Sequence, residues 1–394
     1  MILALCILLL IIGSYAPLGR EQTEETNRVV WVAIFACFIL AWAMPNVWLG
    51  GLLALIGIGI RALPQPHFHV QPHVYPALMW AGLYVVMTSL RSAWTIPLLL
   101  GGILAVGCLS ALWTIHSLCI LERPYIRTYK VWRWKLILWE PKEFGGIVAS
   151  LGNPNHSYAV YCTGLASAIG LVLLDYWWAT AFIGLMALPI LAVLFRGDGT
   201  PHASMLHGYL AALLLSVGPL WFGLSGWIAS IGLGAGLMAW SWIYHIEWWS
   251  GRNQIWGWAW QHLRSLPWHT QAVGLGTGAW LPLMESHRPF HEPATNPHNE
   301  FMGVLIDHGF LGVSILCTYL ATAFWKASQA GPAGKAVFLV GAVLTLCAFV
   351  SFPWNNYLEV GCYDDKTNRI KMSGHGATAL NVISLATAVL VEAL

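Results

Sequence analysis

Residues 298–312 read HNEFMGVLIDHGFLG, and they stand directly after a polar segment rich in His and Trp. The stretch opens a long apolar run, with His298 and Asn299 at its mouth and Gly309 and Gly312 deeper inside it. Small residues three apart allow close helix approach in membranes, so we expect the two glycines to be packing positions. A His-Asn pair at the mouth of such a helix is unusual in a bilayer protein. The stretch therefore predicts a membrane helix with a chemical group at its water-facing end.

The composition extends this prediction to the whole chain. Of the 394 residues, 58% are hydrophobic and 9% are charged, whereas a soluble domain carries about 25% charged residues. Lone strands and loops cannot satisfy their backbone groups in lipid, so the spans should be helices. We expect an all-α membrane protein in which residues 1–394 form a single polytopic domain of about twelve transmembrane helices. The expected spans lie near residues 2–18, 29–44, 47–60, 76–90, 94–117, 157–174, 176–195, 203–218, 221–244, 299–325, 333–352 and 375–393.

The order of spans predicts which segments face which side. An even number puts both termini on one side, and cytoplasmic termini place the segments 118–155 and 245–297 outside. The second segment is then a large extracytoplasmic loop between spans nine and ten, carrying part of the active site. The first holds six basic residues, which conflicts with the positive-inside rule. Either it faces anionic headgroups or a diphosphate, or one span upstream is miscounted.

Other features of the sequence exclude some classes of partner and ligand. The chain lacks the basic runs typical of nucleic-acid binding, so we expect no nucleic-acid partner. Its cysteines lie mostly in apolar runs without the spacing of a metal site, which predicts buried free thiols. His67, His69 and His73 alternate with Pro and have no neighbouring carboxylates, so we expect no metal there.

His298 is the first candidate for chemistry. Asn296 suits an N-cap and Pro297 the first helical position, which predicts that His298 lies in the first turn of the helix. The positive helix end disfavours imidazolium, and a neutral imidazole is what a general base needs. The same helix end attracts anions. The alternative interpretation is an interfacial His that only caps the helix or snorkels.

Arg252 and Arg196 are candidate ligands of phosphate, because a guanidinium keeps its charge and binds phosphate through two parallel hydrogen bonds. Alternatively, Arg252 snorkels at a helix end, and Arg196 pairs with Asp198. Trp256 and Trp260 are one helical turn apart, as in an amphipathic helix at the membrane interface. The glycines of residues 274–278 follow no strand and predict a turn, not a nucleotide loop.

These motifs together resemble the O-antigen ligase family of polytopic membrane glycosyltransferases. The family has His-Asn, a nine-residue gap and Gly-x-x-Gly, as at residues 298–312, and an Arg with a Trp one turn later, as at Arg252 and Trp256. It also has Ser-Arg-Gly where this chain has Phe195-Arg196-Gly197, and a Gly-Asn-Pro-Asn element like residues 152–155. The Phe in place of Ser is a departure. The resemblance covers mainly residues 144–160 and 190–315.

The resemblance implies transfer of a glycan from undecaprenyl diphosphate to a sugar hydroxyl of the lipid A core, on the periplasmic side of a bacterial inner membrane. The implied catalytic residues are His298, Arg252 and Arg196. Asn299, Asn155 and Trp256 are the implied substrate-binding residues, although Asn155 is equally well explained as part of a helix start. His298 would take the acceptor proton while the two arginines hold the diphosphate, so neither a metal nor another cofactor is expected.

The sequence leaves other functions open. An O-antigen polymerase or a protein O-oligosaccharyltransferase would use the same donor with a different acceptor. A lipid-linked glycan transporter would use the arginines only to bind phosphate, and it should tolerate loss of His298. An ion channel or proton-coupled carrier would need ionisable residues in mid-span, and Asp307 and His308 lie only about two turns into their helix.

Overall fold

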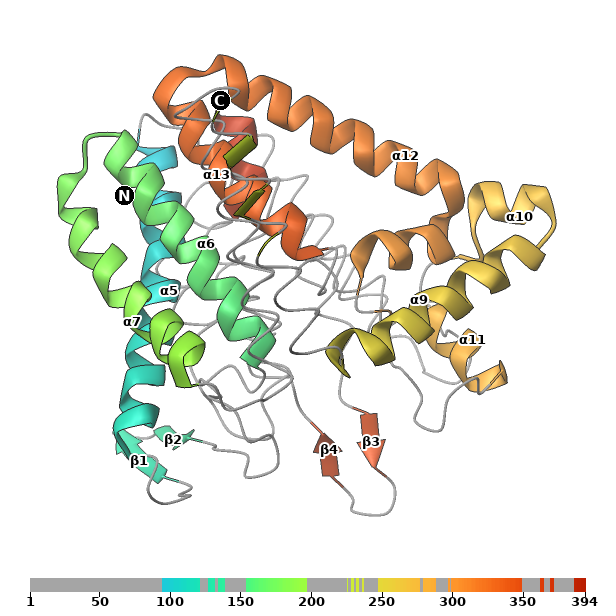
Figure 1. Cartoon of the computed structure of the whole chain (residues 1–394), viewed down its shortest axis with the longest axis horizontal. Coiled ribbons are helices and arrows are strands. Elements are labelled where there is room, and N and C mark those ends of the chain that lie inside the picture. The colour runs from blue at the N-terminus through green and yellow to red at the C-terminus, as the bar shows by residue number, and fades with distance from the viewer. Residues whose placement is uncertain are drawn as a thin grey trace, which may run out of the picture.

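The structure is a computed structural model that describes residues 94–120, 127–131, 134–138, 154–196, 225, 228–229, 232–233, 236, 247–276, 279–287, 297, 299–348, 362–364, 369–371 and 386–394. This part of the chain is predominantly helical, as the sequence predicts (Figure 1). Its elements are α5 (Thr95–Ile120), β1 (Arg127–Val131), β2 (Trp134–Leu138), α6 (Pro154–Leu173), η3 (Trp177–Ala179), α7 (Thr180–Arg196), α9 (Glu247–Ser265), α10 (Trp268–Val273), α11 (Trp280–His287), α12 (Glu300–Gln329), α13 (Gly331–Ala348), β3 (Cys362–Asp364) and β4 (Arg369–Lys371).

Two of these helices are long and apolar enough to cross a membrane. They are α5, through its window Thr95–Leu112, and α12. Shorter apolar helices run over Ala159–Leu173, Trp177–Leu188 and Gly331–Thr345. The four spans expected before residue 94, the one near 203–218 and most of the one near 221–244 lie outside the described residues.

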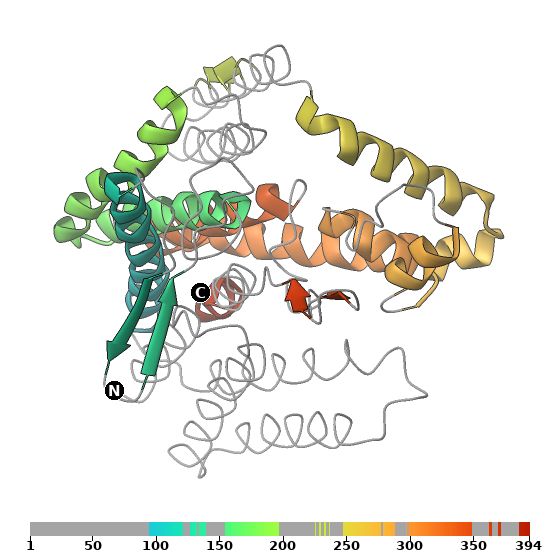
Figure 2. The ribbon, with the colours of Figure 1, turned by 90° about the horizontal axis from the view of Figure 1, so that it is seen from below.

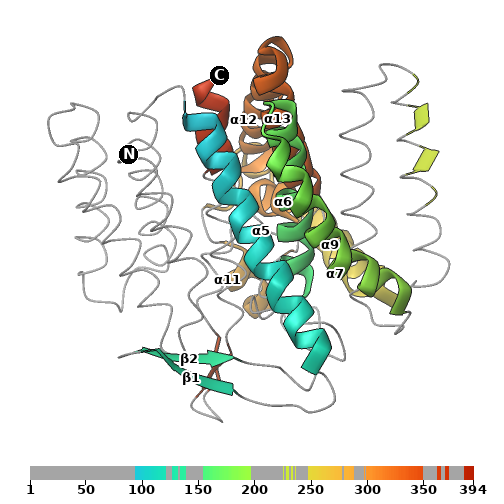
Figure 3. The same cartoon turned by 90° about the vertical axis from the view of Figure 1, so that its left-hand side faces the viewer.

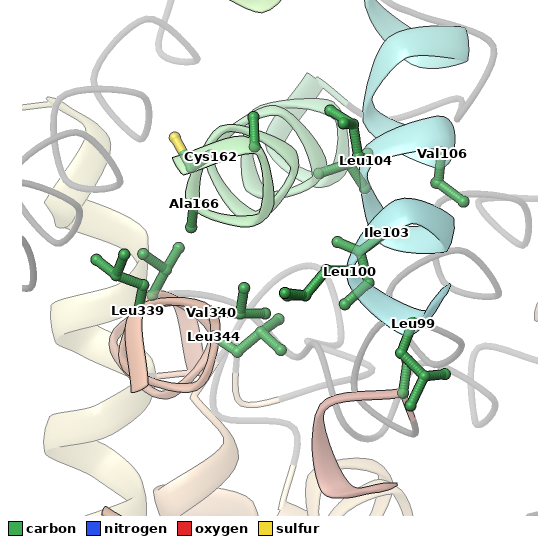
Figure 4. Close-up of a cluster of buried hydrophobic side chains, with 14 of the residues drawn as sticks. Leu99, Leu100, Ile103, Leu104, Val106, Cys162, Ala166, Leu339, Val340 and Leu344 are labelled. Carbon is green, nitrogen blue, oxygen red and sulfur yellow. The ribbon is translucent and has the colours of Figure 1, made fainter. Parts of the chain in front are cut away.

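Helices α5, α6, α7 and α13 form what we call the bundle. Helix α6 packs against α5 on one side and α13 on the other, and α7 packs against α5 and α6 (Figure 3). The buried side chains between them are mostly aliphatic, with Tyr161, Met186 and three cysteines among them. Figure 4 shows Leu100 and Ile103 of α5 across from Val340 and Leu344 of α13, beside Ala166 of α6.

Glycines set the closest approaches in the bundle. A Cβ added at Gly107 of α5 would lie 3.0 Å from the Cα of Gly164 in α6 and 3.0 Å from the Sδ of Met186 in α7. One added at Gly170 of α6 would lie 3.0 Å from the Cβ of Ala336 in α13. The helices therefore meet backbone to backbone, as small residues allow in membrane helix pairs.

Helices α9, α10 and α11 lie on the other side of the molecule from α5 and α7 (Figures 1 and 2). With the first part of α12, Glu300–His308, they form what we call the module. Its own small core includes Ala259 and Leu263 of α9, Met284 of α11 and Ile306 of α12. The described part of the predicted loop 245–297 is thus largely helical. Trp256 and Trp260 lie on a helix, as predicted.

Two short antiparallel hairpins depart from the all-helical prediction. Strands β1 and β2 pair from Arg127 opposite Leu138 to Val131 opposite Trp134. Strands β3 and β4 pair from Cys362 opposite Lys371 to Asp364 opposite Arg369. Both hairpins fall in the polar segments of the chain, where water can satisfy the outer backbone groups that lipid cannot.

Candidate functional site

The start of α12 differs from its prediction. The helix begins at Glu300, and Asn299 is its N-cap, with an extended backbone and a side-chain oxygen that accepts from the N–H of Met302 at 3.0 Å. The prediction that Asn296 caps the helix and that His298 lies in its first turn is therefore wrong. Both asparagines can cap, and the one closer to the apolar run does so. His298 itself lies outside the described residues, immediately before the cap.

Helix α9 is tied to the residue just before His298. The indole Nε1–H of Trp256 donates to the backbone carbonyl of Pro297 at 2.7 Å, across 41 positions of sequence. Arg252 lies one turn before Trp256 on α9, and residues four apart share a helix face. The structure thus ties the helix that carries Arg252 to the backbone of the residue before His298. The side chain of Arg252 lies outside the described residues.

Helix α12 is broken at Gly309, which has φ 64° and ψ −166°. A Cβ added there would lie 2.5 Å from backbone atoms of Gln271 and Ala272, so α10 and α12 meet where only glycine fits. The expectation of one continuous span over 299–325 therefore needs correction. The uninterrupted apolar helix runs from Phe310, and the segment Glu300–His308 takes a separate direction (Figure 1).

The break also changes the interpretation of the two glycines. Gly309 is a packing position, as predicted, but its partner is α10 through a break in the helix. A Cβ added at Gly312 would meet the Cβ of His308 and lie 3.4 Å from the Cγ1 of Val304, so Gly312 closely approaches the segment Glu300–His308 on the other side of the break. Among the described residues, the two glycines contact different elements: Gly309 contacts α10, and Gly312 contacts the segment Glu300–His308. Positive φ at Gly309, not the spacing of three, is what the local structure requires.

The glycine-rich segment after α10 forms the predicted turn and packs on the break. Gly274 and Gly276 both have positive φ. The N–H groups of Leu275 and Gly276 donate to the carbonyls of Ile306 and Asp307, each at 2.9 Å. The N–H of Ala279 is shared between the carbonyl of Gly276 at 3.1 Å and Oδ1 of Asp307 at 3.2 Å. This turn therefore closes against the C-terminal end of the segment that begins beside His298.

A cluster of aromatic and imidazole rings joins α9 to α11. The ring of His262 stacks on Trp258 with centroids 5.4 Å apart, and it meets the ring of His287 at 4.9 Å. Trp280 contacts Trp258 edge to face at 6.2 Å. Burial and then the nearby His287 lower the pKa of His262 below its ordinary value. Sequence reasoning missed this cluster, although the spacing of four between Trp258 and His262 was a signal.

Arg196 and Asn155 lie at one end of the bundle. Asn155 is the second residue of α6 and Arg196 is the last residue of α7, and these consecutive helices run in opposite directions. The side chains of Asn155 and Arg196 lie outside the described residues, so the convergence of Arg196, Arg252 and His298 stays a prediction.

Helix α6 begins with Pro154 at its first position, as the Gly-Asn-Pro-Asn element predicts.

In the described part of the chain, no three His, Cys, Asp or Glu side chains gather as metal ligands would. A scan of known protein families and a search of curated proteins give no match to this chain. The resemblance to O-antigen ligases therefore rests on the motifs themselves.

Proposed function

We propose that this chain is a membrane glycosyltransferase of the O-antigen ligase type. It would transfer a glycan from undecaprenyl diphosphate to a sugar hydroxyl of the lipid A core. The observation that carries the proposal is the hydrogen bond from Trp256 to the carbonyl of Pro297. It joins two motifs that are far apart in the sequence and that the proposed reaction needs side by side.

The proposed roles follow from the chemistry of a diphosphate donor. His298 takes the proton of the acceptor hydroxyl as its oxygen bonds to the anomeric carbon. The bond from that carbon to the diphosphate breaks, and Arg252 and Arg196 stabilise the negative charge that grows on the departing undecaprenyl diphosphate. A single displacement of this kind inverts the anomeric centre. Asn299, Asn155 and Trp256 would shape the substrate-binding site.

The position of His298 before the helix is compatible with the role of a base. The first backbone N–H groups of a helix point outward, and Asn299 occupies that of Met302. The carbonyl of Pro297, the residue before His298, accepts a hydrogen bond from the indole N–H of Trp256. The base would thus sit on a short fixed stretch of backbone between two hydrogen bonds.

The proposed setting is a multi-pass protein of the bacterial inner membrane with about twelve spans and a periplasmic active site. The lengths and apolar composition of α5 and α12 support membrane insertion. The module corresponds to the loop that the topology assigns to the outside. Membrane lipids and the lipid-linked glycan would be the partners of this surface.

The acceptor is tested by a lipopolysaccharide gel of a deletion strain with and without a plasmid copy of the chain. A ligase predicts loss of the whole ladder together with accumulation of lipid-linked glycan. A band with a single repeat would instead indicate a polymerase. An intact ladder with a lighter glycoprotein would indicate a protein O-oligosaccharyltransferase.

The chemistry is tested with purified protein by measuring donor binding and transfer in parallel. His298→Ala should lower transfer by about 10²–10⁴-fold with nearly unchanged donor affinity. Arg252→Ala should lower both, and Arg252→Lys should restore only part, because an ammonium lacks the planar fork. EDTA should leave the wild type active. Full transfer activity in His298→Ala would end the assignment of the base, whereas donor binding without transfer in the wild type would favour a transporter.

A further inference from the structure

The carbonyl groups at the break in α12 are satisfied from outside the helix. In an unbroken helix the carbonyl of Ile306 would accept from the N–H of residue 310, and that of Asp307 from residue 311. The N–H groups of Leu275 and Gly276, which belong to another part of the chain, donate to these carbonyls, each at 2.9 Å. The Gly274 turn therefore caps the end of the segment Glu300–His308.

The contact between the Gly274 turn and the end of the segment Glu300–His308 is called the joint below. Asp307 contributes to it through both its backbone and its side chain. Its Oδ1 accepts from the N–H of Ala279 at 3.2 Å, so one residue holds the turn at Gly276 and at Ala279. The joint has no spare room. A Cβ added at Gly274 would meet the backbone of Asp307 and His308, and one added at Gly309 would lie 2.5 Å from the backbone of Ala272.

We propose that Asp307 is a positioning residue for His298. This inference rests on the proposed function. The segment Glu300–His308 is held at one end by the bond from Trp256 to Pro297 and at the other by Asp307 on the turn. At about 1.5 Å per residue it is roughly 13 Å long, so a loose far end changes the direction of the near end. Asp307 would thus act on the base through the helix, without touching substrate.

The size of the expected effect follows from the tolerance of catalysis to geometry. A displacement of about 1 Å far from the reacting atoms can cost about 10²-fold in rate. The N–H of Ala279 keeps the carbonyl of Gly276 as a second acceptor, so loss of the carboxylate loosens the joint without opening it. We therefore expect Asp307→Ala to lower kcat by about 10- to 100-fold while the KM for the donor stays within about twofold.

Asp307→Asn separates hydrogen bonding from charge. The amide keeps an oxygen that can accept from Ala279 but carries no charge. We expect it to restore kcat to within about threefold of the wild type. The matched control is His308→Ala, because His308 is the exposed neighbour of Asp307 on the same segment. It should leave both kcat and KM unchanged.

The experiment measures kcat and KM of the full-length protein with lipid-linked glycan, together with hydrogen exchange of peptides covering 268–287 and 299–309. Asp307→Ala should speed exchange in both peptides, and Asp307→Asn should not. Equal loss of kcat in Asp307→Asn and Asp307→Ala would overturn the proposal, because charge would then be the requirement. So would a raised KM with unchanged kcat, or wild-type values in Asp307→Ala.

Hydrogen exchange distinguishes failure of the proposed function from failure of the proposed role of Asp307. If the wild type transfers no glycan yet the exchange pattern is as expected, the proposed function fails while the joint stands. If the wild type is active and Asp307→Ala neither slows it nor speeds exchange, the joint fails alone. Should Asp307→Ala not fold, Asp307→Asn decides: near wild-type kcat supports positioning, and a loss of tenfold or more overturns it.

Discussion

The bundle and the module are held together by different kinds of contact. In the bundle, aliphatic side chains and close glycine contacts fill the space between α5, α6 and α13, and among the described side chains Tyr161 and Ser167 of α6 donate hydrogen bonds to carbonyls of α5. In the module the buried core is small, and directed contacts join the elements: Trp256 to Pro297, the Gly274 turn to the break at Gly309, and the ring cluster around Trp258.

The difference has a consequence for function. Non-directional packing of aliphatic side chains tolerates small shifts of one helix along another. A hydrogen bond between defined atoms instead fixes the distance and the relative orientation of the two groups that it joins. A catalytic centre needs its groups held within fractions of an ångström. The module has the kind of contact that such a centre requires. Position 252 belongs to its helix α9, and the candidate His298 directly precedes in sequence the Asn299 cap of its α12 segment. Substitutions that affect one region and spare the other test this division.

The largest effect is expected from a side chain placed at the α5–α6 contact. Gly107→Leu forces a branched side chain against Gly164 and Met186, and overpacking of this kind costs about 3 kcal/mol at the upper end of its usual range. The control is Gly101→Leu on the same helix, where an added Cβ meets nothing within 4 Å. The yield of monodisperse protein in detergent should collapse for Gly107→Leu only. Equal yields would show that the bundle is not glycine-packed.

A smaller and local effect is expected from Gly309→Ala. The conformation at φ 64° and ψ −166° is reserved for glycine and costs other residues about 1–3 kcal/mol, and the added Cβ meets the backbone of α10. Hydrogen exchange should quicken in the module and stay unchanged in the bundle. Gly257→Ala is the control, because it adds a Cβ in open space on α9 and should stabilise that helix by about 1 kcal/mol. Faster exchange throughout the chain would mean that the two regions unfold together.

Much of the described fold could be predicted from the apolar runs. The predicted span 94–117 corresponds to α5, 157–174 to α6 and 333–352 to α13, each within a few residues. The turn at Gly274 and the helical start at Pro154 were also predicted correctly. These features are local: an apolar run, a proline or paired glycines restrict the backbone wherever they stand.

The features that escaped prediction depend on contacts between distant residues. At the break at Gly309, the carbonyls of Ile306 and Asp307 accept from the N–H groups of Leu275 and Gly276. No local sequence pattern predicts these bonds, because the donors lie about thirty residues away. The start of α12 was misplaced because two asparagines can each act as cap. In the structure Asn299 is the cap, and the preceding Pro297 accepts a hydrogen bond from the distant Trp256. The site was predicted as a set of motifs, and the way its backbone is held was not.

A moderate effect is expected from the hydrogen bond between α6 and α5. The hydroxyl of Ser167 donates to the carbonyl of Leu100, and such bonds between membrane helices are worth about 1 kcal/mol. Ser167→Ala should lower the melting temperature of the bundle slightly. Thr163→Val is the control, since that hydroxyl bonds only carbonyls of its own helix and its loss should cost less. A larger loss in Thr163→Val would mean that directed bonds do not order the bundle.

The smallest effect is expected from pH, and it should be confined to the module. Because the pKa of His262 is lowered in the folded protein, the neutral ring is favoured there, and the unfolded chain takes up a proton more readily. The free energy that the neutral His262 ring contributes to folding is therefore fully present above the ordinary histidine pKa of about 6.5. It decreases as the pH falls below that value. Hydrogen exchange of α9 and α11 at pH 8 and pH 5.5 should show this loosening. His262→Phe keeps a ring on Trp258 and should remove the pH dependence, whereas His269→Gln, which deletes an exposed imidazole on α10, should keep it. If hydrogen exchange of α9 and α11 in His262→Phe still responds to pH, another titratable group controls the contact between these helices.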